Sequence, residues 1–307
     1  MFYRFVSKQL KRSVENLLVH CEIISSRRTE RVEHTRCRER FDTMDLQLKD
    51  KLALVSGSTA GIGFAIANAL VREGARVIIN GRSNERVSSA REHMRSHNPG
   101  ANVEGIAVDL GTASGAEEVA RRFPEVDVLV NNLGIFEPKP FEQISDADWF
   151  RFFEVNVMSG VRLSRAYLPS MKKKNWGRIV FISSESGIQI PVEMIHYGVT
   201  KTAQIAVARG IAETCAGTGL TCNAVLPGPT ASEGVDEFVG SLASQGGQTR
   251  QQVEKEFFEK ARPTSLLKRF ATPDEVAAMV VFICSPLSAA TNGAAVRVDG
   301  GVVRSPF

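Results

Sequence analysis

Four polar residues in the second half of the chain could together transfer a proton. They are Asn156 in FFEVNVM, Ser184 at the end of RIVFISS, and Tyr197 and Lys201 in YGVTK. Side chains at i and i+4 share one face of a helix, so a helix would place the ammonium of Lys201 beside the phenol of Tyr197. A phenol with a reference pKa of about 10 is a poor base at neutral pH. Because a nearby cation favours the phenolate, we expect Lys201 to lower the pKa of Tyr197 toward a working acid/base range.

A serine hydroxyl upstream of the tyrosine completes this chemistry. Ser184 precedes Tyr197 by 13 positions, and it could donate a hydrogen bond to a substrate oxygen that becomes anionic as its carbon changes hybridisation. Ser183 is the alternative, and the spacing favours Ser184. His196 would point about 100° away from Tyr197 around a helix, so we interpret it as structural or substrate-lining. The set suits the interconversion of a carbonyl and an alcohol.

A glycine-rich loop near the start of the chain could hold a phosphate-bearing cofactor. It follows the apolar run 52–55 and precedes a segment of helical periodicity, and its candidate binding residues are Gly57, Ser58, Gly61, Ile62 and Gly63. In a strand–turn–helix context, glycines let the backbone approach a pyrophosphate, and the helix N-terminus offers free amides and a positive dipole. Glycines spaced in this way occur by chance. The pattern gains weight from the YGVTK string, whose tyrosine lies 140 residues after Gly57.

The order of these motifs resembles the short-chain dehydrogenase/reductase family, from about Leu48 to the C-terminus, including its 3-oxoacyl-[acyl-carrier-protein] reductases. The resemblance also rests on AVDLG around Asp109, on NNLG at 131–134, on LPGPT at 226–230 and on VDGG at 298–301. Two positions depart from the family pattern: Ser56 replaces the usual Thr and keeps its hydroxyl, and Leu133 replaces the usual Ala.

The resemblance implies further site residues. Lys201 would also bind the nicotinamide ribose, and Asn156 would hold a water that links Lys201 to solvent. Asp109 would bind adenine, although a helix cap is the alternative for this residue. The remaining cofactor contacts implied by the family are Asn131, Gly134, Pro227, Gly228 and Thr230. The family also implies a homo-oligomer, either a tetramer or a dimer.

The end of the second expected strand favours NADP(H) over NAD(H). In dinucleotide folds an acidic residue at this point binds the ribose 2′-OH, whereas an arginine accommodates a 2′-phosphate. Here the strand ends Asn80-Gly81-Arg82-Ser83, with no carboxylate. We expect Arg82 to pair with the phosphate and Ser58 to add a hydroxyl donor. The alternative for Arg82 is an exposed turn residue.

Composition excludes several other functions. The formal net charge of +4 comes from residues 1–43, with ten Lys or Arg and six Asp or Glu, while 28 basic and 28 acidic residues follow. A neutral body argues against a nucleic-acid or membrane partner. The five cysteines include no CxxC pair, which indicates reduced thiols in a cytoplasmic protein without a metal. We interpret residues 1–43 as an N-terminal extension, disordered or a mis-called start, and a tail that contacts a partner is the alternative.

Alternating strand and helix signals over residues 44–307 predict one α/β domain, a doubly wound parallel sheet of the Rossmann type. Seven strands are expected, at 52–56, 76–80, 103–109, 126–131, 178–183, 220–226 and 295–298. Thr272 and Ser145 are expected helix caps. Residues 230–270 are too long for an ordinary connection and are interpreted as a helical lid over the substrate. Its apolar residues are Phe238, Leu242, Phe257, Phe258, Leu266 and Leu267.

Together these features predict an NADP(H)-dependent oxidoreductase that acts on a small-molecule carbonyl or secondary alcohol. A 3-oxoacyl-carrier-protein reductase is the alternative within enzymes. Relatives of that kind carry basic residues near the site mouth, one of them after the YxxxK helix, where this chain has Thr218. A dinucleotide-binding sensor without turnover is the alternative of another class, and the complete set of four polar residues argues against it.

Overall fold

The computed structural model describes residues 44–306. The extension predicted at residues 1–43 lies outside the described residues. Within the described part of the chain, no helix is both long and apolar enough to cross a membrane.

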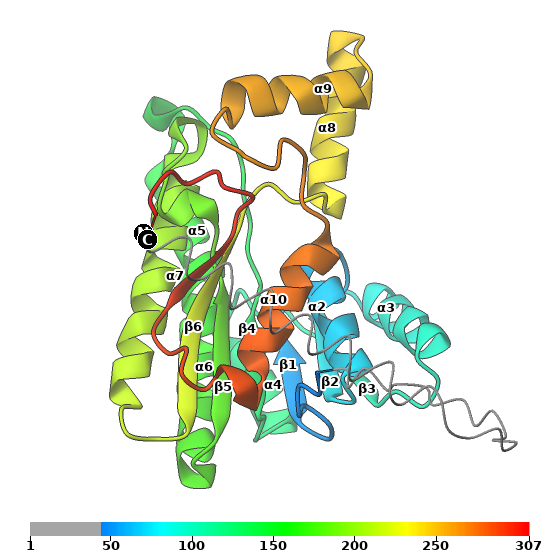
Figure 1. Cartoon of the computed structure of the whole chain (residues 1–307), viewed down its shortest axis with the longest axis vertical. Coiled ribbons are helices and arrows are strands. Elements are labelled where there is room, and N and C mark those ends of the chain that lie inside the picture. The colour runs from blue at the N-terminus through cyan, green and yellow to red at the C-terminus, as the bar shows by residue number, and fades with distance from the viewer. Residues whose placement is uncertain (1–43, 307) are drawn as a thin grey trace, which may run out of the picture. The chain divides into compact units, whose positions relative to one another are not determined.

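A single parallel sheet of seven strands forms the centre of the fold (Figure 1). The strands are β1 (Leu52–Val55), β2 (Arg76–Gly81), β3 (Val103–Ala107), β4 (Val128–Asn131), β5 (Gly177–Ile182), β6 (Leu220–Pro227) and β7 (Ala295–Val298). Their order in the sheet is β3-β2-β1-β4-β5-β6-β7. The predicted fold class and all seven strands are confirmed, with ends that shift by at most two residues. The order reverses between β1 and β4, which is where open α/β sheets bind ligands beyond the carboxyl ends of the strands.

Helices cover both faces of the sheet and extend beyond its carboxyl edge. They are α2 (Gly61–Arg72), α3 (Asn84–His97), α4 (Ala113–Arg122), α5 (Asp146–Phe153), α6 (Ser159–Lys174), α7 (Ile195–Thr214), α8 (Glu233–Gly246), α9 (Arg250–Glu256) and α10 (Pro273–Cys284). Both predicted caps are confirmed, because Thr272 and Ser145 form capping boxes with Glu275 and Asp148.

Alternating apolar side chains of the strands divide the core into two layers. In β1, Ala53 and Val55 pack with α2, α3 and α10, whereas Leu54 packs with α4, α6 and α7. A strand sends successive side chains to opposite faces, so a continuous apolar strand needs helices on both sides. The two layers hold the sheet rigidly, and the loops at its carboxyl edge can therefore position side chains for chemistry.

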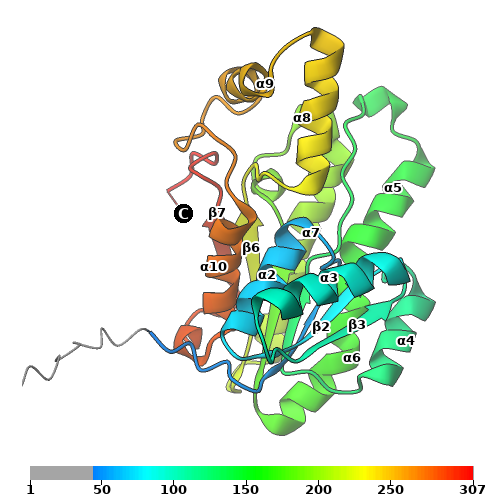
Figure 2. The ribbon, with the colours of Figure 1, turned by 90° about the vertical axis from the view of Figure 1, so that its right-hand side faces the viewer.

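The segment expected to be a lid forms α8, α9 and a π-helical turn, η5 (Phe257–Ala261). Figures 1 and 2 show α8 and α9 beyond the carboxyl end of the sheet. Phe257, Phe258 and Phe270 pack as a cluster with ring centroids 5.1 to 5.3 Å apart. The side chains of Phe238 and Leu242 lie outside the described residues.

Candidate active site

The first turns of α7 carry the predicted tyrosine and lysine on one side of the helix. Lys201 Nζ lies 5.5 Å from the centre of the Tyr197 ring, as the i, i+4 spacing predicted. Lys201 is 4% exposed and donates a hydrogen bond of 2.9 Å to the carbonyl of Ile182 at the end of β5. The helix and the strand end therefore fix the ammonium at the carboxyl edge of the sheet.

The pKa of the tyrosine shifts in the direction opposite to the prediction. Burial raises the pKa of Tyr197 to about 12, and a hydrogen bond with Ser184 opposes that rise. Burial lowers the pKa of Lys201 to about 7. Desolvation disfavours the charged form of each group. For Tyr197 it outweighs the lowering of the pKa by the Ser184 hydroxyl and by the charge of Arg262. Tyr197 is thus a protonated donor in this state, which suits the protonation of a nascent alkoxide.

The two serines at the end of β5 have different partners. Ser183 Oγ donates to the backbone carbonyl of Lys201 at 2.7 Å and so ties β5 to α7. Ser184 lines the cavity with Tyr197 and lowers the pKa of that tyrosine, and its Oγ accepts a hydrogen bond from the Ser186 N–H at 3.1 Å. This geometry favours Ser184 over Ser183 as the residue that polarises a substrate oxygen.

Asn156 lies in a π-helical turn, η2 (Glu154–Met158), that interrupts the continuous helix formed by α5 and α6. Its Oδ1 accepts from the Ile135 N–H at 2.7 Å, and its Nδ2 donates to the Ile135 carbonyl at 3.0 Å and to Thr200 Oγ1 at 2.9 Å. Its backbone carbonyl accepts from Gln204 Nε2 at 2.6 Å. Asn156 therefore links the loop after β4 to α7, and π-turns of this kind are frequent at functional sites.

Gly134 lies beside both Asn156 and Lys201. A Cβ on Gly134 would come within 3.4 Å of Lys201 Nζ and 3.5 Å of Asn156 Oδ1. The two polar groups thus lie on the same side of the loop after β4.

The glycine loop has the backbone that a pyrophosphate site requires. Gly57 and Gly61 adopt φ values of +60° and +57°, a region that glycine occupies at little cost. A Cβ on Gly63 would lie 2.3 Å from the Gly57 carbonyl oxygen, so this position needs a glycine. The N-cap residue of α2, Ala60, makes no side-chain capping bond. The amides of the first turn are therefore available to a phosphate, and the loop fits a dinucleotide.

Ser58, a predicted cofactor contact, has a different role. Its hydroxyl is fully buried, donates to the Val55 carbonyl at 2.7 Å and accepts from the Asn80 N–H at 2.9 Å. The prediction of a hydroxyl donor to a 2′-phosphate is therefore wrong for Ser58, because its proton is already used within the fold. Asn80 is also buried and accepts from the Gly57 N–H at 3.2 Å. Ser58 and Asn80 together hold the glycine loop against the end of β2.

The side chain of Asn131 does not have the role expected from the sequence. Asn131 is buried and donates to Ser164 Oγ at 3.2 Å, behind the sheet, so its side chain does not pack along a cofactor. Asn132 instead lines the cavity and donates to the carbonyls of Ser56 and Gly57. Ser56 accepts from the N–H groups of Asn132 and Leu133 at 2.9 and 3.0 Å. The hydroxyl that Ser56 retains thus couples the glycine loop to the loop after β4.

Arg82 and Asp109 lie at the ends of β2 and β3, toward the expected adenosine. Arg82 is exposed, and among the described residues it has no ion-pair partner. Asp109 is also exposed, and its Oδ1 accepts from the Gly111 N–H at 2.9 Å. The N-cap of the following helix α4 is Thr112, so the alternative of Asp109 as that cap is wrong.

A cavity of about 850 Å³ opens beside Tyr197 at the carboxyl edge of the sheet. Several predicted residues line it: Ile62, Gly134, Ser184, Tyr197, Lys201, Pro227, Gly228 and Thr230. Its other walls come from α8, α9, η5 and the connection to α10. They include Val235, Val239, Val253, Phe257 and Phe270. The cavity therefore joins the proton-transfer residues to the apolar side chains of the segment 230–270.

Three charged residues of this cavity were missed by the sequence analysis. Arg262 pairs with Glu185 at 2.9 Å and with Glu193 at 3.1 Å. Glu185 directly follows Ser184, and this neighbour of a candidate catalytic residue was the available signal. Leu266 and Leu267, expected on the substrate side, do not line the cavity. Their N–H groups donate to the Gly300 carbonyl at 2.8 and 3.0 Å.

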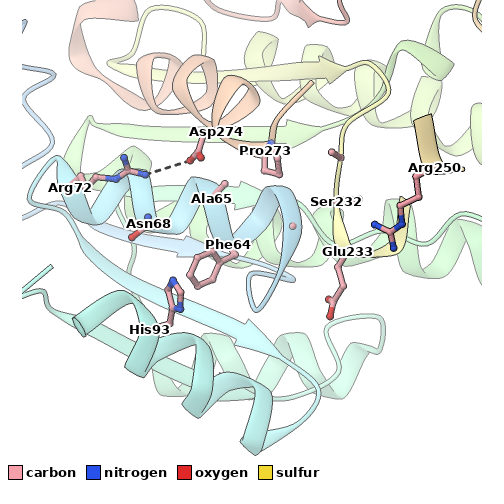
Figure 3. A pocket seen from close by; sticks show the side chains of 12 residues that line it. Phe64, Ala65, Asn68, Arg72, His93, Ser232, Glu233, Arg250, Pro273 and Asp274 are labelled. Carbon is pink, nitrogen blue, oxygen red and sulfur yellow. Dashed lines mark hydrogen bonds and ion pairs between the residues drawn. The ribbon is translucent and has the colours of Figure 1, made fainter. Parts of the chain in front are cut away.

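A second cavity, of about 650 Å³, lies on the outer side of α2 (Figure 3). Phe64 and Asn68 of α2 point toward it, His93 of α3 and Asp274 of α10 border it, and Arg72 pairs with Asp274 at 3.5 Å. None of the proton-transfer residues lines this cavity. Substrate chemistry therefore belongs to the first cavity.

Comparison with known proteins agrees with the fold. The model of a family described as enoyl-(acyl carrier protein) reductase matches residues 57–303. An uncharacterised oxidoreductase of Bacillus subtilis, YvaG, is 50% identical over 86% of this chain and 100% of its own length. The 3-oxoacyl-[acyl-carrier-protein] reductase FabG of Aquifex aeolicus is 33% identical over 84% of this chain and 100% of its own. This chain belongs to the short-chain dehydrogenase/reductase family of oxidoreductases.

Solved structures with the same fold include enzymes with a bound nicotinamide cofactor. L-Sorbose reductase from Gluconobacter frateurii, complexed with NADPH and L-sorbose, superposes with a TM-score of 0.80 at 29% identity, over 85% of this chain and 100% of its own. A structure described as a putative gluconate 5-dehydrogenase from Beutenbergia cavernae, with bound NADP, has a TM-score of 0.73 at 30% identity, over 85% and 100%.

Proposed function

We propose that the chain is an NADP(H)-dependent oxidoreductase that interconverts a carbonyl and a secondary alcohol. One observation carries the proposal: Ser184, Tyr197 and Lys201 converge on one cavity at the sheet edge where the glycine loop lies. The cofactor, when bound, supplies or accepts the hydride. The protein's own groups handle the proton and the developing charge on oxygen.

Each of the four polar residues has a defined task in the reduction. Ser184 donates a hydrogen bond to the substrate carbonyl, and Tyr197 protonates the oxygen as the carbon becomes tetrahedral. Lys201 holds the nicotinamide ribose and passes protons toward the tyrosine. Asn156 fixes the loop after β4 against α7 and continues the relay toward solvent.

The preference for NADP(H) rests on the end of β2. The residues at this end are Asn80, Gly81, Arg82 and Ser83, so there is no carboxylate to bind a ribose 2′-OH. The Asn80 side chain is buried and hydrogen-bonded within the fold. Arg82 is exposed and has no ion-pair partner among the described residues, which leaves its guanidinium available for a 2′-phosphate. The relatives with bound NADPH and NADP support this choice.

We propose a free carbonyl compound as the substrate, with segment 230–270 as the lid that excludes water from it. The names of the relatives do not decide the matter, because they include carrier-protein reductases, a D-beta-hydroxybutyrate dehydrogenase and a sugar reductase. Thr218 does not decide it either. It lies two residues before β6, at the amino edge of the sheet, whereas the cavity lies at the carboxyl edge.

The proposal is tested by following NADPH absorbance against ketones, aldehydes and 3-oxoacyl thioesters. We expect turnover with a free carbonyl compound and a faster rate with NADPH than with NADH at equal concentration. A strong, salt-sensitive preference for a 3-oxoacyl group on carrier protein over its simple thioester would favour the carrier-protein reductase instead. NADPH binding without turnover of any compound would favour a sensor.

A further inference from the structure

A cluster of three charged residues, two of them buried, forms one wall of the substrate cavity. Arg262, 7% exposed, lies just after η5, at the end of the lid segment. Its Nε donates to Glu185 Oε1 at 2.9 Å, and its Nη1 donates to Glu193 Oε1 at 3.1 Å. Glu185 is 3% exposed and directly follows Ser184. Two carboxylates thus share one guanidinium beside a candidate catalytic serine.

The cluster acts electrostatically on the reacting group. Glu185 contributes to the raised pKa of Tyr197 through its charge, after burial, and Arg262 opposes it. The same cavity is bordered by Tyr197, Glu185, Glu193 and Arg262. A substrate held with its carbonyl at Tyr197 therefore lies within the field of this cluster, and low-dielectric surroundings strengthen that field.

The cluster itself offers no unpaired cation to an anionic substrate. With both glutamates ionised, the three residues carry a net charge of −1, and with Glu185 protonated they carry none. Of the other cations lining the cavity, Lys260 pairs with Glu256 at 2.8 Å, and Lys201 donates to the Ile182 carbonyl. Among the described residues, no cation of the cavity wall other than Lys201 is without a carboxylate partner.

We infer that the Glu185–Arg262–Glu193 cluster sets the charge of the substrate, so that the enzyme accepts uncharged carbonyl compounds and discriminates against carboxylates. A carboxylate that leaves water needs a compensating cation, and the nearest guanidinium is already neutralised. An ester or a hydroxymethyl group meets no such penalty. The inference rests on the proposed function, which it narrows to a class of substrate.

Two matched pairs of probes isolate charge from the rest of the substrate. Ethyl acetoacetate and acetoacetate share a 3-oxo chain, and only the second is an anion at pH 7. L-Sorbose carries a hydroxymethyl group at the position where 5-keto-D-gluconate carries a carboxylate. For each compound, kcat/KM is measured with saturating NADPH, and the neutral-to-anionic ratio is the quantity compared.

Glu193→Gln is the main test variant, because the Glu193 side chain is 43% exposed and can lose its charge with little disturbance of the fold. We expect a neutral-to-anionic ratio of about tenfold or more for the wild type. In the variant this ratio should fall by about three- to tenfold, because the cluster has lost one negative charge. A tenfold change in the ratio corresponds to about 1.4 kcal/mol. Glu118→Gln, which removes a carboxylate paired with Arg121 on α4, is the matched control and should leave the ratios unchanged. Glu185→Gln should shift the ratios in the same direction as Glu193→Gln.

The possible outcomes separate the inference from the proposed function. Equal or better use of the anionic probes by the wild type would overturn the inference and leave the proposed function intact. Ratios that stay unchanged in both Glu193→Gln and Glu185→Gln would also overturn it, because another feature would then set the preference. No NADPH oxidation with any of the four probes would overturn the proposed function and the inference with it.

Discussion

Lys201→Met should stabilise the protein in the absence of cofactor while it removes activity. The ammonium of Lys201 is buried, and burial lowers its pKa from 10.5 to about 7. Because the unfolded chain binds this proton more tightly than the folded one, wild-type stability rises with pH between about 7 and 10.5. Stability from this group is fully present above 10.5 and is lost as the pH falls toward 7. Methionine has a similar shape and no proton to bind.

The magnitude follows from these two pKa values. At about 1.4 kcal/mol per pKa unit, the lysine costs about 4 kcal/mol of unfolding free energy at pH 7 and about 2 kcal/mol at pH 9. Methionine also removes the hydrogen bond to the Ile182 carbonyl, which costs about 1 to 2 kcal/mol. We therefore expect a net gain of about 2 to 3 kcal/mol at pH 7 and almost none at pH 9.

Urea unfolding at pH 7 and pH 9, without cofactor, measures this difference. Lys173→Met is the control, because Lys173 is exposed on α6 and should change stability little at either pH. Lys201→Met should also bind NADPH more weakly, which an activity assay alone would not separate from loss of chemistry. A variant that is less stable than wild type at pH 7, or whose gain does not shrink at pH 9, would refute the reasoning.

Four further predictions follow from the site and its surroundings. Tyr197→Phe should bind NADPH normally and lose about 10² to 10⁴ in kcat, since it removes only the proton donor; more than about a tenth of wild-type activity at the optimal pH would contradict that role. Arg82→Ala should raise KM for NADPH by roughly ten- to a hundredfold, as loss of a charged hydrogen bond of about 1.5 to 3 kcal/mol implies, and should leave NADH unaffected; a wild-type preference for NADH would overturn the assignment. His196 is buried against Phe152, neither of its ring nitrogens is hydrogen-bonded, and burial lowers its pKa from the usual 6.5. The free energy of unfolding of the wild type should therefore fall as the pH drops below 6.5, by at most about 1.4 kcal/mol per pH unit. His196→Leu should lack this slope in urea titrations, and His93→Gln, a change at an exposed histidine, should keep it. A chain that begins at Met44 should be as active as the full chain and melt at the same temperature, and a melting temperature several degrees lower would show that residues 1–43 pack on the body.

The fold could be predicted because its signals are local and repeated. Each strand is a short apolar run bounded by polar or glycine residues, and Thr272-Pro273 and Ser145 begin helices through capping bonds that involve only a few neighbouring residues. The pair Tyr197 and Lys201 is also local, since four residues of helix fix their separation. Such features need no knowledge of distant contacts.

The errors and omissions involve several partners that are distant in sequence. The Ser58 hydroxyl donates locally to Val55, but it also accepts from Asn80, 22 residues away, and Arg262 meets Glu185 across 77 residues. The choice between Asn131 and Asn132 depends on which of them the end of β4 directs toward α6, and neighbouring residues of a strand face opposite sides. The raised pKa of Tyr197 depends on burial, which the lysine spacing could not reveal.

Four groups whose charged form is disfavoured by burial lie close together at the active site. The pKa of Glu185 and that of Tyr197 are raised, and the pKa of His196 and that of Lys201 are lowered, with burial as the first cause in each case. All four lie between the end of β5 and the second turn of α7. Of these groups, Glu185 and Lys201 would be charged at pH 7 in the unfolded chain, so burial of these two weakens the folded state at that pH. The Tyr197 phenol is neutral at pH 7 in both states, and its raised pKa therefore costs no stability there. A dinucleotide that binds only the folded chain would offset the cost of Glu185 and Lys201 by mass action, and without it the two apolar layers of the sheet must supply that stability.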